Sequence, residues 1–437
     1  MKIAIIGTGG AGSTAAWLLD GRHEVDIYER NAKIGGHANT VELEADGVMH
    51  YIDDGFNWFS TVMYPRYLAL LEAIGSETIS VPMSAAYWDT RTERSISMPP
   101  IGMGRVGRLM LEPSRIVTLL RLAGVLWHAE KIVENKETQL TARQFLDKHK
   151  VQSKFADEFL IPFMSGAWGC PHERTADMSI YPLMKYIVLH KPSGFSYYHW
   201  QVIKGGCNAY IRKLHAGLGV QARCDATIVE LNRKEDGIEL VDKEGQRVMY
   251  DHVVMTCGAR DATKILNASS GFDKRRDVLA GMEYYKAHVA SHTDRSYMPP
   301  ARHDWAICNV RHTGERADAT IWDGWSSGKD VFDSYIDPAG EMPKGCKNIS
   351  PFWLPIEDPK FFRQQAKLAD LQGEGGLWVC GDYTQDLGGH EDAVASALDA
   401  VRAIEGSDAD NARSALLQGA ADRHFQDGPK ALATGPA

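Results

Sequence analysis

The sequence has no long hydrophobic run, no paired cysteines and no excess of basic charge. No apolar stretch in its 437 residues approaches the roughly 18 residues of a membrane-spanning helix. A strand-like run and a glycine turn follow the start, so a signal peptide is not expected. The 7 dispersed cysteines indicate neither a disulfide framework nor a metal site, and they fit a reducing cytoplasm. The net charge of -9 argues against nucleic acid as a partner.

The start of the chain carries the most informative pattern. Residues 2–6 form a short β-branched run, a helical pattern follows, and a second strand at 24–28 ends at Glu29. Strand, glycine turn, helix, strand and acid are typical of a dinucleotide-binding βαβ unit, in which the acid accepts hydrogen bonds from ribose. The helix N-terminus attracts the pyrophosphate. An acid here favours FAD or NAD over NADP. The predicted turn residues are Gly7, Gly9, Gly10, Ala11 and Gly12.

A second glycine pair, Gly35-Gly36, favours FAD over NAD. With it, the sequence resembles the superfamily of flavin amine oxidases, phytoene-type desaturases and GDP-dissociation inhibitors. In that superfamily the acid, a short loop and the pair wrap the FAD ribityl and pyrophosphate, and an Asp-x-Gly turn follows. The family often has Arg after the pair, where this chain has His37. Beyond Glu29, the resemblance assigns to the cofactor site Arg30, Gly35, Gly36, His37, Ala38, Asp54, Gly55 and Phe56.

The far end of the chain supplies a third part of the pattern. A buried-strand pattern ends in Gly381-Asp382, and a helix of small residues follows Gly389. In the resembled family the acid bonds the ribityl or pyrophosphate region. The next helix points its N-terminus at the flavin pyrimidine edge, where it stabilises negative charge on the reduced ring. The resemblance also places a backbone against adenine and a returning strand beside the cofactor. The residues assigned in these ways are Ile228, Gly258, Gly381, Asp382, Asp392, Ala393 and Val394.

We therefore predict an α/β fold: a Rossmann-type FAD-binding domain with a doubly wound parallel sheet, glutathione-reductase-like, and an inserted α+β substrate domain. The first insert is mostly helical by pattern, and the second mixes strands and loops. The polar tail is expected to form a loosely packed helix that fades into disorder. The predicted segments are 1–75, 196–260 and 371–405 for the FAD domain, 76–195 and 261–370 for the substrate domain, and 406–437 for the tail.

Several phrases are similar to one bacterial subgroup, FAD-dependent oxidoreductases found with cyclopropane and modified fatty-acid synthesis. The sequence departs from this subgroup at 322–325, 335–338 and 383–387, where substrate would sit. The substrate is therefore expected to differ from that of the subgroup. The matching phrases are 34–41, 159–162, 202–206, 291–294 and 389–392.

Flavin oxidation requires no catalytic triad or metal, because the isoalloxazine itself accepts the hydride. His37 beside the glycine pair and His390 before the flavin-facing helix are candidate proton acceptors or hydrogen-bond donors to the flavin. Lys286 is the third candidate, since a lysine of amine oxidases bonds a water near flavin N5. The aromatic wall of that family falls on Gly389 here. This lowers amine oxidation relative to reactions of an apolar carbon skeleton.

The expected function is an FAD-dependent oxidoreductase, an oxidase or desaturase, that transfers hydride from an apolar substrate, for example an acyl chain, to flavin N5. Molecular oxygen is a candidate electron acceptor. The alternatives are a flavin amine oxidase, a redox-neutral flavin isomerase and a non-catalytic binding protein. Residues 101–127 set four arginines among apolar residues. Such a segment is a solvated surface helix, a peripheral membrane contact or a lid over a lipid-like substrate.

Overall fold

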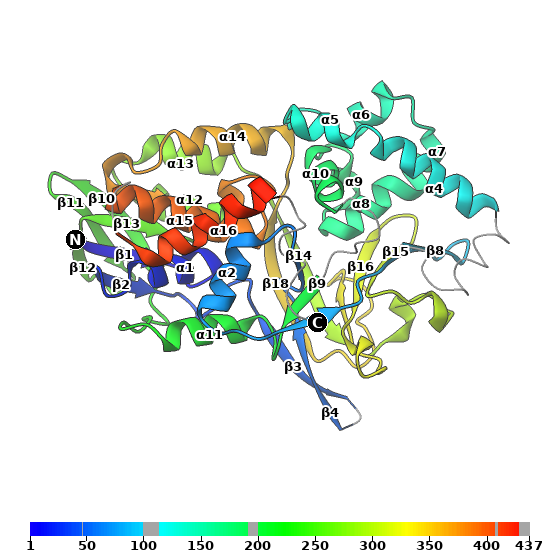
Figure 1. Cartoon of the computed structure of the whole chain (residues 1–437), viewed down its shortest axis with the longest axis horizontal. Coiled ribbons are helices and arrows are strands. Elements are labelled where there is room, and N and C mark those ends of the chain that lie inside the picture. Colours follow the sequence, from blue (N-terminus) through cyan, green and yellow to red (C-terminus); the bar gives the residue numbers. More distant parts are fainter. Residues whose placement is uncertain (46, 99–112, 191–199, 407–409, 428–437) are drawn as a thin grey trace.

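A four-stranded parallel sheet joins the start, the middle and the end of the chain (Figure 1). The computed structural model describes residues 1–45, 47–98, 113–190, 200–406 and 410–427. The sheet forms because its short strands are apolar on both faces, as strands buried between two layers must be; Ile3, Ala4 and Val254 are fully buried. In spatial order its strands are β19 (Leu377–Val379), β13 (His252–Met255), β1 (Lys2–Ile6) and β2 (Glu24–Tyr28).

Different layers cover the two faces of this parallel sheet. One apolar cluster joins alternate strand residues, such as Ile5 and Ile27, to the helices of one face, and a second cluster joins Ala4 and Met255 to the other layer. The helices are α1 (Gly10–Leu19), α11 (Asn208–Ala216) and α15 (His390–Glu405). The other layer contains the antiparallel strands β10 (Ile228–Lys234), β11 (Gly237–Asp242) and β12 (Arg247–Tyr250), with α12 (Ala259–Asn267), α13 (Asp273–Ala280) and α14 (Pro359–Ala369). This is the predicted Rossmann-type α/β architecture.

A seven-stranded sheet combines strands from both predicted inserts. Its pairing is antiparallel except between β7 and β15, which run parallel. The strands at the start of the first insert differ from the mostly helical expectation; they are short, and sheet partners far along the chain stabilise them. In spatial order the strands are β18 (Asn348–Pro355), β14 (Tyr284–His292), β17 (Phe332–Tyr335), β16 (Ala317–Trp322), β15 (Cys308–His312), β7 (Ala85–Asp89) and β8 (Arg94–Met98).

The remaining elements surround these sheets. Two smaller sheets pair β3 (Thr40–Ala45) with β4 (Val48–Asp53), and β9 (Trp200–Ile203) with β5 (Phe59–Ser60) and β6 (Thr78–Val81). Over the described residues no helix is both long and apolar enough to cross a bilayer. The first insert supplies α4 (Pro113–Leu126), α5 (Ala129–Glu134), α6 (Ala142–Lys148), α7 (Ser153–Phe155), α8 (Ile161–Trp168), α9 (His172–Thr175) and α10 (Tyr181–Leu189).

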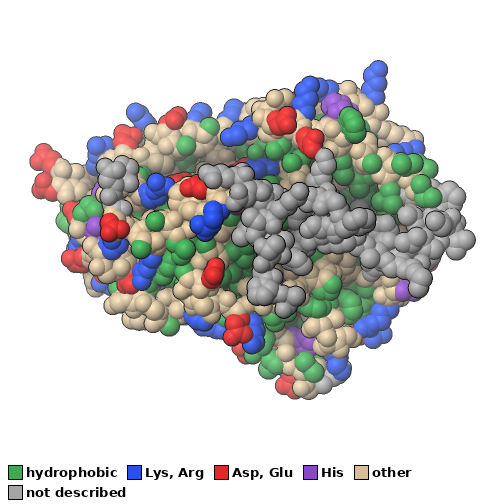
Figure 2. All heavy atoms as spheres, viewed as in Figure 1, with side chains coloured by type: hydrophobic (Ala, Val, Ile, Leu, Met, Phe, Trp, Pro, Cys, Tyr) green, Lys and Arg blue, Asp and Glu red, His purple; other side chains and the backbone are tan. Residues whose placement is uncertain are grey.

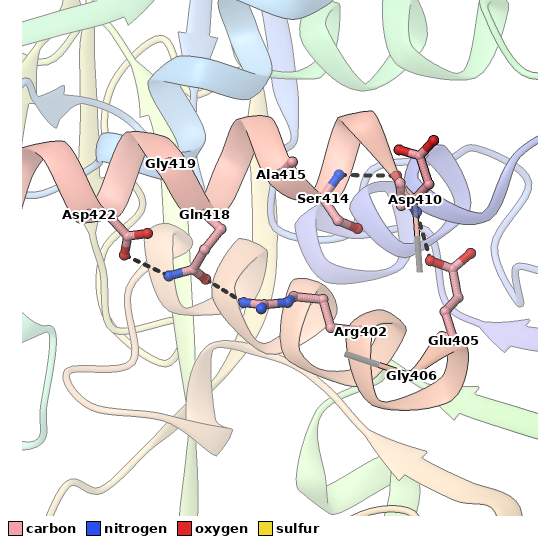
Figure 3. A pocket seen from close by; sticks show the side chains of 10 residues that line it. Arg402, Glu405, Gly406, Asp410, Ser414, Ala415, Gln418, Gly419 and Asp422 are labelled. Carbon is pink, nitrogen blue, oxygen red and sulfur yellow. Dashed lines mark hydrogen bonds between the residues drawn. The ribbon is translucent and has the colours of Figure 1, made fainter. Parts of the chain in front are cut away.

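The C-terminal helix is packed, which corrects the expected looseness of the tail over the described residues 412–427. Helix α16 (Ala412–Asp427) lies against α2 (Pro65–Ala73). Leu417 and Ala421 are fully buried, because small residues let the helix approach its neighbours. In the hollow between α15 and α16, Arg402 donates to Gln418 at 2.9 Å and Gln418 to Asp422 at 2.8 Å (Figure 3). These hydrogen bonds therefore connect α15 to α16 across the hollow. Residues 428–437 lie outside the described part of the chain.

Candidate functional site

The turn between β1 and α1 presents backbone N–H groups. Helix α1 begins at Gly10, and its N-cap residue, Gly9, has no side chain that could cap it. The first-turn N–H groups are thus available to an anion. Gly7 has a φ of 108°, which favours glycine. A Cβ on Gly12 would overlap the carbonyl oxygen of Gly7, so only glycine permits this close packing; Ala11 is buried behind the turn.

Glu29 ties the end of β2 to this turn. It is 4% exposed, and its Oε2 accepts hydrogen bonds from the Thr8 amide at 3.1 Å and hydroxyl at 2.6 Å. Its Oε1 accepts from the Asn31 amide at 2.9 Å. Carboxylate oxygens have acceptor sites beyond these three, so a ribose hydroxyl can be added. Arg30 instead lies at the surface and forms an ion pair with Asp261 at 2.8 Å.

Two strand ends flank Glu29. The Ala226 amide donates to the Glu29 carbonyl at 2.9 Å, which brings the buried Ile228, the first residue of β10, near the end of β2. Gly258 is the N-cap of α12. Two residues earlier, the Thr256 hydroxyl donates to the Gly7 carbonyl at 3.1 Å. Ile228 therefore lies near the end of β2, and Gly258 follows a strand end that contacts the glycine turn.

The second glycine pair lies against the first turn. Gly36 has a φ of 56°, and a Cβ there would stand 3.1 Å from Gly9 Cα. Asn208, at the start of α11, donates from its Nδ2 to the carbonyls of Ile34 at 3.0 Å and Ala38 at 2.9 Å. The helix thus holds the loop that contains Gly35 and His37. Sequence reasoning missed Asn208; its position at a helix start after a glycine pair was the available signal.

The Asp-x-Gly turn fits onto the same loop. The Phe56 amide donates to the His37 carbonyl at 3.0 Å, and a Cβ on Gly55 would overlap that carbonyl. Asp54 accepts from Asn39 Nδ2 at 2.8 Å and from the Ser350 hydroxyl of β18. Burial raises the pKa of Asp54. The turn therefore connects the nucleotide-binding loops to the seven-stranded sheet.

The start of α15 completes the arrangement. A Cβ on Gly10 would stand 2.7 Å from His390 Cε1, so the first residues of α1 and α15 meet. The Gly389 amide donates to Asp392 Oδ2 at 3.1 Å, and Ala393 and Val394 are buried behind it. Gly381 has a φ of 154°. Burial raises the pKa of the neighbouring Asp382, while His37 opposes that shift.

The three candidate catalytic residues have different environments. His390 contacts the Tyr210 hydroxyl through Nε2 and stacks on Phe56 at 4.1 Å between ring centroids. Burial, followed by the charge of His37, lowers the pKa of His390 to about 3, so its ring is neutral at neutral pH. His37 is exposed and meets Phe352 edge-on at 5.3 Å. Lys286 is exposed on β14, paired in register with Trp353.

Half-buried aromatic side chains continue from this region into the inserts. The Tyr64 hydroxyl lies 3.7 Å from where a Cβ on Gly389 would stand. Tyr186 lies 6.2 Å from Trp168 and 6.1 Å from Trp200 between ring centroids. Burial raises the pKa values of Tyr64, Tyr186 and Tyr335, the last with its ring against Gly169. We call Tyr64, Trp168, Tyr186, Trp200 and Tyr335 the aromatic patch.

The geometry fits an FAD. Four segments distant in sequence meet around one glycine-lined cradle, which a Cβ at Gly10 or Gly36 would partly fill. An uncapped helix start, a buried acid and the N-terminus of α15 lie where a pyrophosphate, a ribose and a flavin edge would need them. Among the described residues no group of His, Cys, Asp and Glu side chains is arranged to hold a metal ion.

Comparison with known proteins agrees with this geometry. Over 78 residues, 18% of this chain and 13% of the relative, the chain is 42% identical to zeta-carotene desaturase of Solanum lycopersicum. The chain thus matches only a small part of that protein. A CLA-producing fatty acid isomerase from P. acnes shares the fold with a TM-score of 0.66 and 13% identity over 92% of this chain and 98% of that one. A putrescine oxidase variant has a TM-score of 0.65 and 12% identity over the same shares.

The family model of flavin-containing amine oxidoreductases matches residues 11–286. This range begins within α1 and ends in β14; it includes the loop at Gly35 and Gly36 and the turn at Asp54, whereas residues 7–10 and α15 lie outside it. The match covers 276 of the 437 residues, more than half of the chain. The chain therefore belongs to the flavin-containing amine oxidoreductase family and is an FAD-dependent oxidoreductase.

Proposed function

We propose that this chain oxidises an apolar substrate, such as an acyl chain, by hydride transfer to flavin N5, as an oxidase or desaturase. The aromatic patch supports this proposal, because its rings extend from Gly389 into the inserts and offer apolar contacts to a long substrate. We infer the domain division given by the sequence: segments 1–75, 196–260 and 371–405 bind FAD, and 76–195 and 261–370 bind substrate. Because α12, α13 and α14 cover the parallel sheet, the part of 261–370 that we expect to meet substrate is its share of the seven-stranded sheet.

The proposed roles of the chain follow from the site. FAD supplies the hydride acceptor. The first turn of α1 binds its pyrophosphate, Glu29 its ribose, and the N-terminus of α15 stabilises negative charge at the pyrimidine edge. We propose the exposed His37 as the proton acceptor. His390, with a pKa of about 3, remains neutral and lines the site as a hydrogen-bonding group. A catalytic role for Lys286 stays a prediction.

Anaerobic reduction of the bound flavin tests this proposal. The protein is mixed with free fatty acids, with diamines, or with NADH and NADPH, and flavin bleaching is followed. Bleaching by acyl chains is expected. Trp168→Ala should slow this bleaching while flavin content stays unchanged, and Trp378→Ala, outside the aromatic patch, serves as the control. Oxygen consumption after reduction then identifies molecular oxygen as acceptor. Bleaching by diamines alone would refute the proposal.

One observation favours amine oxidation as the second candidate. The aromatic wall of amine oxidases is missing at Gly389, but the Tyr64 hydroxyl approaches that position from a different segment. An aromatic ring is therefore present after all. For this candidate, Tyr64→Leu should abolish bleaching by diamines. A redox-neutral isomerase, in contrast, would change acyl double bonds without net flavin reduction or oxygen consumption.

We infer that α4 contacts a membrane surface. Of the segment predicted at 101–127, residues 101–112 lie outside the described part of the chain. The exposed fractions are 39% for Ile116 and 66% for Leu120 in α4, and 85% for Trp127, which directly follows the helix. These residues recur at helical spacing with exposed Arg121 between them, the pattern of an interfacial helix on anionic lipid. In Figure 2, basic and acidic side chains are elsewhere interspersed on the face shown.

Vesicle binding tests this contact. The protein should cosediment with phosphatidylserine-containing vesicles and less with neutral ones. Trp127→Ser should weaken that binding, whereas Met249→Ser, at an exposed residue of β12 (42% exposed), should not. Equal binding by the two variants would contradict the role of α4. A cytoplasmic location with peripheral attachment is the localisation that we propose.

A further inference from the structure

Glu357 lies between the predicted flavin turn and the inserts. It follows β18 and precedes α14, and it is 6% exposed. Its carbonyl accepts a hydrogen bond from the Ser179 amide at 2.8 Å. Its Oε1 lies 2.8 Å from where a Cβ on Gly388 would stand, and Gly388 has a φ of 71°. The carboxyl therefore lies directly against the turn that leads into α15.

One oxygen of this carboxyl is unpaired. Oε2 of Glu357 is buried and has no hydrogen-bond partner among the described residues. Nearly all buried polar atoms in proteins have a partner, and a buried ionised carboxylate without a cation is strongly unfavourable. Glu357 is therefore expected to carry a proton in the resting protein.

The charged and titratable groups around Glu357 act in the same direction. Burial, followed by the charges of Asp382 and Asp392, raises the pKa of Glu357 to about 8, while a hydrogen bond from the Trp168 side chain opposes this shift. Lys185, a cation that acts on the neighbouring Asp392, is paired with Asp386. The titratable groups that face Glu357 are Asp382 and Asp386 before α15, Asp392 at its start, Cys170 beside α8, and Tyr285 on β14.

We propose that Glu357 is a positioning residue that couples reduction of the bound flavin to uptake of a proton. This inference rests on FAD occupying the site proposed above. Two electrons and one proton reduce a flavin and leave one negative charge on its ring. That charge disfavours an ionised Glu357 nearby, so a carboxylate that has lost its proton in alkaline solution binds one from solvent when the flavin is reduced. Reduction then takes up two electrons and two protons in place of one.

The reduction equilibrium of the bound flavin as a function of pH tests this coupling. The FAD-loaded protein is titrated with dithionite against a reference dye from pH 6 to pH 10. Below pH 8 the equilibrium constant for reduction should fall tenfold per pH unit, as one proton requires. Just above pH 8 it should fall about 100-fold per unit, because a second proton enters. Glu357→Gln should keep the tenfold slope throughout, since a neutral amide does not titrate.

The control is Glu374→Gln, a surface carboxyl of which 52% is exposed, which should keep the steeper alkaline slope. A wild-type protein without a change of slope between pH 7 and pH 9 would overturn the inference, and this measurement needs no variant. So would a steeper slope that persists in Glu357→Gln. Failure of the wild-type protein to bind FAD would refute the proposed function instead, and the flavin absorbance shows this before any titration.

Discussion

Replacing Glu29 by Gln tests whether the buried acid at the end of β2 holds the cofactor or only the fold. The wild-type carboxylate accepts three hydrogen bonds from Thr8 and Asn31. Glutamine keeps one oxygen, so its amide nitrogen faces at least one N–H or O–H donor. A hydrogen bond to a charged group contributes about 1.5–3 kcal/mol. The free energy of unfolding of the flavin-free variant should therefore be about 2 kcal/mol lower than that of the flavin-free wild type.

FAD binding supplies the second measurement. If a ribose hydroxyl donates to the same carboxylate, the loss of that bond should weaken FAD binding roughly 10- to 100-fold. Urea unfolding of the flavin-free protein and a fluorescence titration with FAD measure the two effects separately. Glu24→Gln on the same strand, whose side chain is 68% exposed, should change neither. Lower stability with unchanged FAD affinity would show that Glu29 is structural alone and refute its ribose role.

Three further predictions concern titration, packing and backbone. Burial raises the pKa of Asp53 to about 7 and of Glu357 to about 8, above their unfolded values. Above about pH 6.5, where buried histidines of lowered pKa such as His390 no longer act in the opposite sense, the stability of the flavin-free protein should therefore fall as the pH rises to 8; urea unfolding that shows a rise over this range would contradict this. Leu417→Ala should cost about 2–5 kcal/mol, whereas Leu416→Ala (41% exposed) should change stability little; equal effects would mean a loose α16. Gly36→Val, at a φ of 56° against Gly9, should abolish FAD retention, whereas Gly21→Ala, in open space at a φ of 73°, should retain it.

The nucleotide-binding layers could be predicted because their signals are local. In β1, α1 and β2, strand, turn, helix and acid follow one another within 29 residues, and each residue type performs its task through its immediate neighbours. The packing of α16 could not be predicted in this way. Its sequence is polar overall, and only contact with α2 and the parallel sheet's helices shows that Leu417 and Ala421 form a buried stripe.

Residues that act across long sequence separations were missed for the same reason. Tyr64 approaches Gly389, and Asn208 holds the loop that contains Gly36. The glycine pair before α11 could have marked Asn208 as a candidate, but no spacing in a single sequence reveals which segment either residue contacts. The sequence has glycine at position 389, where amine oxidases have an aromatic residue. The aromatic ring of Tyr64 nevertheless lies beside that position. A residue type that is missing from one segment can be supplied to the same site by another segment, which a single sequence does not show.

Glu357 shows how a local pattern can hide a buried group. In the sequence, Glu357, Asp358 and Pro359 resemble the ordinary start of a helix, and Asp358 does cap α14 by accepting from the Phe361 amide at 2.7 Å. Because Asp358 accounts for the acidic pattern as a helix cap, the sequence gives no reason to expect that the neighbouring Glu357 is buried. The capped helix fixes the backbone direction, however, and β18 fixes it from the other side. Between two rigid elements the Glu357 side chain has little freedom to reach water, and it lies instead against the turn at Gly388. The group that we expect to respond to flavin reduction is thus buried by the elements on either side of it, neither of which contains a glycine motif.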